Sequence, residues 1–168
     1  VGAQISAIQS SNAHLSNGLA TWVPRISHEG HTFIVEATAG SGKTQLALKL
    51  LRNAALKKER ALYVCYNRPL ADHIQTLVPS HTEVATFHQH CDDYAKQHGH
   101  TPDFSNAKVY DEVAKIYMAE ASNIAPRFDL LVIDESQDFN LEWVDALSQE
   151  LKSNGCMYVL GDDNQKLY

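Results

Sequence analysis

Short apolar runs alternate with amphipathic stretches along most of the chain. The runs Phe33 to Val35, Ala61 to Tyr66, Val84 to Phe87, Leu130 to Ile133 and Tyr158 to Leu160 are rich in β-branched or aromatic residues and predict strands. The run from Leu130 to Ile133 is apolar at every position, which is typical of a strand buried on both faces of a parallel sheet.

The stretches between these runs have the spacing of helices. The predicted helices are Thr44 to Leu56, Leu70 to Leu77, His88 to His98, one with a face formed by Val109, Val113, Ile116 and Tyr117, and Leu141 to Leu151. Strands that alternate with helices predict a parallel α/β sheet flanked by helices, in three α/β/α layers. Ligands of such sheets bind at the carboxyl ends of the strands, so we expect the functional residues in the loops that follow the strands.

A glycine-bearing loop follows the first predicted strand and opens the first predicted helix. Residues 37–44 read Ala-Thr-Ala-Gly-Ser-Gly-Lys-Thr, which fits the Walker A pattern with Ala in the first glycine position. The glycines allow consecutive N–H groups to point at one anion, and the helix N-terminus favours negative charge. The loop therefore predicts a P-loop NTPase that binds ATP. The predicted binding residues are Ala39, Gly40, Ser41, Gly42, Lys43, Thr44 and Gln45.

Two of these residues have specific predicted roles. Lys43 would reach the β- and γ-phosphates, and the Thr44 hydroxyl would coordinate Mg²⁺. A pair of carboxylates, Asp134 and Glu135, follows the most apolar strand. Asp134 would hold Mg²⁺, and Glu135 would orient and deprotonate the attacking water. Acidic residues are common at strand ends, so this interpretation requires the loop around Lys43 and the two carboxylates to converge in space.

Longer motifs give the sequence a family resemblance. Residues 134–138 (DESQD) resemble motif II (DExQD) of UvrD/Rep-like superfamily 1 DNA helicases. Residues 161–168 (GDDNQKLY) resemble motif III of that family, with Leu167 where Ile is usual, and residues 63–71 and 86–88 are similar to motifs Ia and Ib. The resemblance implies a RecA-like domain that couples Mg-ATP hydrolysis to movement on single-stranded DNA.

The resemblance also implies roles for individual residues. Gln165 would contact the γ-phosphate and complete a catalytic set with Lys43 and Glu135. In the family, the loops of motifs Ia and Ib hold the DNA strand. Arg68 and Asn67 can bind phosphate and aromatic rings can stack on bases, although each ring is equally compatible with core packing. The implied nucleic-acid contacts are Tyr66, Asn67, Arg68, Thr86, His88 and Tyr168.

The domain organisation implied by the resemblance is simple. We expect residues 1–30 to form an N-terminal extension with a pattern compatible with a helix, and residues 31–168 to form the RecA-like domain, with a short helical insert at about 91–128. The chain ends at motif III, so we expect the second RecA-like domain, a partner that supplies arginine fingers, to lie outside it. We therefore expect nucleotide binding with little turnover. A stand-alone or regulatory nucleotide-binding switch remains an alternative, whereas the helicase-like motifs argue against a nucleotide or sugar kinase.

Composition limits the remaining function classes. The formal net charge is −6, so any nucleic-acid contact must be made by a few loop residues rather than by a basic face. The three widely spaced cysteines suit the reducing cytoplasm, and no apolar run is long enough to span a membrane. His88, His90 and Cys91 lie around a helix rather than on one face, which disfavours a zinc site. We expect the histidines to be solvated or to cap helices.

Overall fold

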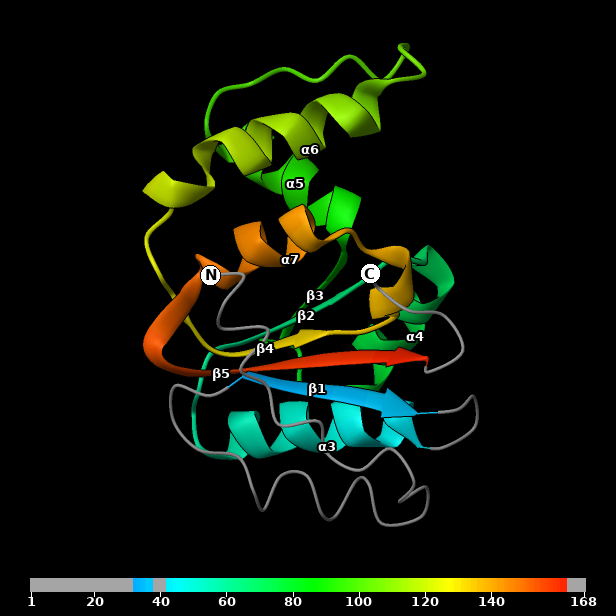
Figure 1. Cartoon of the computed structure of the whole chain (residues 1–168), viewed down its shortest axis with the longest axis vertical. Helices are drawn as coiled ribbons and strands as arrows, with labels where there is room; N and C mark the ends of the chain where they lie inside the picture. Colours follow the sequence, from blue (N-terminus) through cyan, green and yellow to red (C-terminus); the bar gives the residue numbers. More distant parts are fainter. Residues whose placement is uncertain (1–31, 38–41, 163–168) are drawn as a thin grey trace.

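Five parallel strands form one sheet in the computed structural model, which describes residues 32–37 and 42–162 (Figure 1). The strand order is β1-β5-β4-β2-β3, and every neighbouring pair is parallel. The strands are β1 (Thr32–Ala37), β2 (Ala61–Cys65), β3 (Glu83–Thr86), β4 (Phe128–Ile133) and β5 (Leu151–Asp162). The carboxyl ends of all five strands therefore lie along one edge of the sheet.

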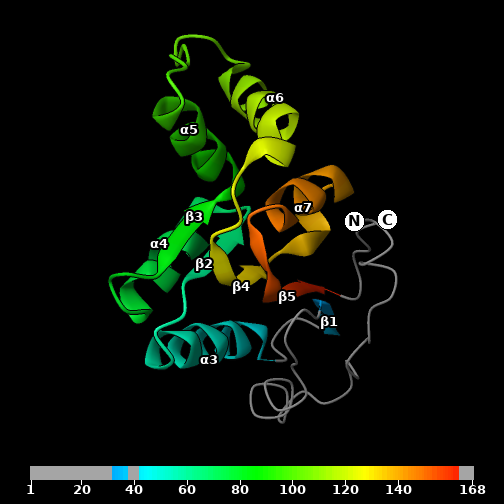
Figure 2. The same cartoon turned by 90° about the vertical axis from the view of Figure 1, so that its left-hand side faces the viewer.

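Helices cover both faces of this sheet, which confirms the predicted α/β class with three layers (Figures 1 and 2). One face packs against α3 (Lys43–Leu56) and α4 (Arg68–Leu77). The other face packs against α5 (Phe87–Gln97) and α7 (Leu141–Ser148), and α6 (Val109–Glu120) packs on these two helices. Among the described residues, no helix combines the length and the apolar composition that crossing a bilayer requires.

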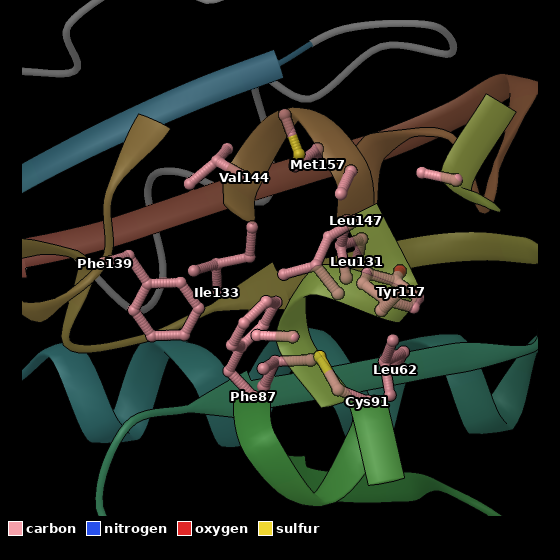
Figure 3. Close-up of a cluster of buried hydrophobic side chains, with 14 of the residues drawn as sticks. Leu62, Phe87, Cys91, Tyr117, Leu131, Ile133, Phe139, Val144, Leu147 and Met157 are labelled. Atoms are coloured by element: carbon pink, nitrogen blue, oxygen red, sulfur yellow. The ribbon is translucent and has the colours of Figure 1, made fainter. Parts of the chain in front are cut away.

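Alternate residues of the strands supply two separate cores. On β2, Tyr63 and Cys65 face the core beneath α3 and α4, whereas Leu62 and Val64 face the core beneath α5, α6 and α7. Figure 3 shows the second core, in which Phe87 and Leu147 from the helices meet Leu131 and Ile133 of β4 and Met157 of β5. Burial of both faces explains why the central strands are almost entirely apolar.

The boundary between α7 and β5 differs from the prediction. The helix ends at Ser148 rather than Leu151, and Leu151 already belongs to a strand and pairs with Phe128. A register shift follows, because the next paired residues are Leu130 and Cys156. Residues 152–155, which lack apolar side chains, therefore lie within β5, although the apolar pattern predicts a strand only from Tyr158 to Leu160. A bulge of this kind is difficult to predict from sequence because its unpaired residues need no apolar face.

Part of the predicted site lies outside the described residues. This applies to the N-terminal extension (1–30) and to Ala39, Gly40, Ser41, Gln165 and Tyr168. The other predicted site residues fall on the strand ends, the adjoining loops and the first turns of the helices.

Candidate functional site

Helix α3 begins at the carboxyl edge of the sheet. Gly42 caps this helix with φ 94° and ψ 18°, a left-handed conformation that glycine adopts without a Cβ penalty. The first turn carries no acidic side chain, and Lys43 is its first residue. A helix of 14 residues presents N–H groups without intrahelical acceptors and a partial positive charge at this end. The geometry suits a bound anion.

Asp134 follows β4 and is almost fully buried, with 5 % of its surface exposed. Its backbone N–H donates to the carbonyl of Val64 at 2.8 Å, which extends the pairing of β4 with β2. Its Oδ2 accepts a hydrogen bond from the Tyr63 hydroxyl at 2.7 Å. Its Oδ1 accepts one from the N–H of Glu135 at 2.8 Å. Each carboxylate oxygen thus has one donor and keeps further acceptor capacity.

Lys43 and Asp134 act on each other electrostatically. Burial raises the pKa of Asp134, and the hydrogen bonds from Tyr63 and Glu135 together with the charge of Lys43 offset only part of that rise. The first turn of α3 and the buried carboxylate lie at the same carboxyl edge of the sheet. A buried carboxylate whose charge is not fully compensated, next to an ammonium and a helix N-terminus, fits a magnesium ion carried by a polyphosphate.

Glu135 is held by the loop that follows β2. Its Oε1 accepts hydrogen bonds from the backbone N–H groups of Tyr66 at 3.2 Å and Asn67 at 3.1 Å. Its backbone is left-handed with φ 54°, which is uncommon for a residue other than glycine. Burial raises the pKa of the Glu135 carboxyl, although the two N–H groups oppose the rise. A strained, partly desolvated carboxylate is typical of a functional position.

Three rings from separate elements meet beside this loop. Tyr66, 43 % exposed, stacks on Trp143 of α7 with ring centroids 6.3 Å apart and planes 11° apart. His88 of α5 lies edge-on to both rings, at 6.0 Å from Tyr66 and 5.3 Å from Trp143. We call Tyr66, His88 and Trp143 the aromatic cluster. Sequence reasoning missed Trp143, because its position in a helix carries no motif.

The remaining predicted contacts of the loops have structural partners. The Asn67 side chain caps α4 by accepting from the N–H of Leu70 at 2.9 Å. Arg68 is exposed and forms an ion pair with Asp72 at 3.1 Å. Thr86 is buried, and its hydroxyl oxygen caps α5 by accepting from the N–H of Gln89. Arg68 is therefore open to solvent, whereas Thr86 is buried and caps a helix.

The segment after β4 that contains DESQD touches the end of β5. The N–H of Asp162 donates to Oε1 of Gln137 at 3.3 Å. Gly161 lies so close to Ser136 that a Cβ at position 161 would collide with the Ser136 Oγ. The approach explains why glycine occupies this strand position, and it ties the segment after Asp134 to the end of β5.

The expectation of solvated histidines is wrong for His90. This side chain is 7 % exposed and its Nε2 lies within hydrogen-bonding distance of Glu150. The hydroxyl of Tyr117 and the guanidinium of Arg127 contact the same carboxylate. These partners lie on α5, on α6 and just before β4, so only the folded chain brings them together.

Comparison with protein families agrees with this geometry. The family model described as "AAA domain" matches residues 24–168. No curated protein sequence matches the chain.

Proposed function

Because the chain belongs to this AAA domain family, we propose that it is the Mg-ATP-binding domain of a UvrD/Rep-like superfamily 1 helicase. Such a protein couples ATP hydrolysis to movement on single-stranded DNA. One observation carries the proposal: Lys43, in the first turn of α3, and Asp134, buried just after β4, lie at the same carboxyl edge of the parallel sheet. The DESQD and GDDNQKLY motifs give the finer assignment to the helicases.

In this proposal the phosphates of ATP lie at the amino end of α3. The N–H groups of its first turn and the Lys43 ammonium bind the phosphate oxygens, while Thr44 and Asp134 hold the metal ion. Magnesium, when bound, neutralises phosphate charge. Burial of Asp134 favours a cation at this position because the carboxylate lacks water to stabilise its charge.

Glu135 is the proposed general base. It orients the attacking water and accepts its proton, and burial moves the pKa of its carboxyl upward, which strengthens a carboxylate base. Its hydrogen bonds to Tyr66 and Asn67 connect it to the loop proposed to hold the DNA strand. Occupation of that loop can therefore influence the base.

The aromatic cluster is the proposed contact for single-stranded DNA. An exposed ring such as Tyr66 offers a stacking surface for a base without requiring a particular sequence. The exposed guanidinium of Arg68 can bind a backbone phosphate. A local contact of this kind suits a chain with a net charge of −6. Thr86 is buried, so it takes no part in the proposed contact.

Isothermal titration calorimetry with Mg-ATP tests the nucleotide site. We expect the wild-type chain to bind and Lys43→Ala to lose at least about tenfold in affinity, equivalent to about 1.4 kcal/mol. Lys49→Ala, on the same helix, is the matched control and should bind as the wild type does. Absence of binding by the wild type, or equal binding by Lys43→Ala, would contradict the proposal. The same titrations with oligothymidylate present test the link to DNA.

A further inference from the structure

The hydroxyl group of Tyr63 is not explained by core packing alone. It lies in the middle of β2 with 0 % of its surface exposed, in a core built mainly of aliphatic side chains such as Val35, Leu51 and Val132. Burying a hydroxyl without a partner costs free energy, so an apolar side chain would serve better if packing were the only requirement. The hydroxyl has one observed partner, the Asp134 carboxylate, at 2.7 Å.

The sheet register makes this pairing direct. Tyr63 pairs with Val132 and Val64 pairs with Ile133, so Asp134 is the first residue beyond the paired segment. Its N–H is fixed to the carbonyl of Val64, and its Oδ1 is fixed by the N–H of Glu135. The Tyr63 hydroxyl supplies the contact that holds Oδ2. Without it, the hydrogen bond from the N–H of Glu135 to Oδ1 would remain, and Oδ2 would have more freedom to turn away from its present position.

We propose that Tyr63 is a positioning residue, which orients the Asp134 carboxylate toward the metal ion of Mg-ATP. This inference rests on the proposed function of the site. Removing a residue that hydrogen-bonds to a metal ligand typically lowers metal affinity by ten- to a hundredfold, because the ligand must then be ordered during binding. Tyr63 does not itself touch nucleotide or metal, so its effect should appear only where Mg²⁺ is involved.

The test measures ATP binding by calorimetry as a function of Mg²⁺ concentration for wild type and Tyr63→Phe. We expect the Mg²⁺ concentration at half-maximal binding to rise about tenfold in the variant. Binding of ATP in excess EDTA should stay unchanged, because Lys43 and the α3 terminus are intact. A general loss of packing would weaken both kinds of binding together.

Tyr117→Phe provides a matched control. Tyr117 is also fully buried and donates its hydroxyl hydrogen bond to a buried carboxylate, Glu150, but it belongs to the core on the other face of the sheet. This variant should show the wild-type Mg²⁺ dependence even if its thermal stability falls. Tyr63→Leu, a second variant without the hydroxyl, should reproduce the shift seen with Tyr63→Phe.

The possible results distinguish failure of the proposed function from failure of the positioning role. If the wild type binds no Mg-ATP, the proposed function itself is wrong. If the wild type binds and Tyr63→Phe has the same or a tighter Mg²⁺ dependence, only the positioning role is overturned. Loss of cooperative thermal unfolding in both Tyr63→Phe and Tyr63→Leu would make the hydroxyl a structural requirement and would also overturn it.

Discussion

The carboxylate of Glu135 accepts a hydrogen bond from the backbone N–H of Asn67 at 3.1 Å. The neighbouring N–H, that of Tyr66, donates to the same oxygen at 3.2 Å. The residue proposed to act on water is thus bonded to the backbone of the loop proposed to bind the DNA strand. The Tyr66 ring, on the same loop, stacks on Trp143. One short loop therefore connects the nucleotide site to the aromatic cluster.

This connection predicts that Glu135 influences the binding of single-stranded DNA without touching the DNA. Glu135→Ala removes the acceptor for two loop N–H groups, so the loop becomes less ordered and binding of oligothymidylate in the absence of nucleotide should weaken several-fold. Glu135→Gln keeps an oxygen acceptor and should bind nearly as the wild type does. Fluorescence anisotropy of a labelled oligonucleotide measures both. Equal affinities of the Ala variant and the wild type would show that the loop does not depend on Glu135.

The aromatic cluster gives a second prediction. Replacing Tyr66 by Ala should weaken oligothymidylate binding by about 1–3 kcal/mol, because a base loses its stacking partner. In a Trp22→Phe background, the fluorescence of Trp143 should change when the oligonucleotide binds, since Trp143 stacks on Tyr66.

Phe104→Ala is the control for this prediction. Phe104 is also an exposed ring, 53 % accessible, but it contacts Tyr110 and Lys96 instead of the cluster. It should leave both affinity and fluorescence response unchanged. Similar losses in the two variants would indicate nonspecific contact with any exposed ring.

The parts of the fold that the sequence predicts are those set by local pattern. The fully apolar run at Leu130 to Ile133 predicts a central buried strand, and β4 is that strand. The Walker A residues after an apolar run predict a strand, a loop and a helix, and β1 and α3 flank the loop as expected. The acidic pair Asp134 and Glu135 is recognisable because it directly follows this apolar run in the sequence, which places it at the carboxyl end of the strand.

The parts that the sequence does not predict depend on contacts between distant segments. Tyr63 reads as an ordinary strand residue, and only the pairing of β2 with β4 places its hydroxyl on Asp134. Trp143 reads as part of an amphipathic helix, and only the packing of α7 beside the β2 loop gives it a role. The start of β5 at Leu151 is hidden by polar residues in the register shift. No local periodicity records any of these relationships.

A third prediction concerns the contact of Gly161 with Ser136. Gly161→Ala introduces a methyl group against the Ser136 hydroxyl, and overpacking of this kind costs about 1–3 kcal/mol of unfolding free energy. The double variant Gly161→Ala, Ser136→Ala removes the clashing oxygen and should recover most of that loss. Urea denaturation of the four chains in the cycle measures the coupling. Strictly additive effects would show that the two residues are not in close contact.

The final prediction concerns stability in acid. Glu150 is 1 % exposed; burial alone would raise the pKa of its carboxyl, but hydrogen bonds and charge from His90, Tyr117 and Arg127 hold the pKa at about 2. Because the folded pKa lies below the ordinary value of 4.5, the stabilisation is present above pH 4.5 and is lost as the pH falls toward 2. The loss amounts to roughly 3 kcal/mol, and urea denaturation at several pH values should show it. Glu150→Gln should flatten this dependence, whereas Glu83→Gln, at a half-exposed partner of Arg127, should preserve it. An unchanged acid profile in Glu150→Gln would assign the loss to other carboxylates.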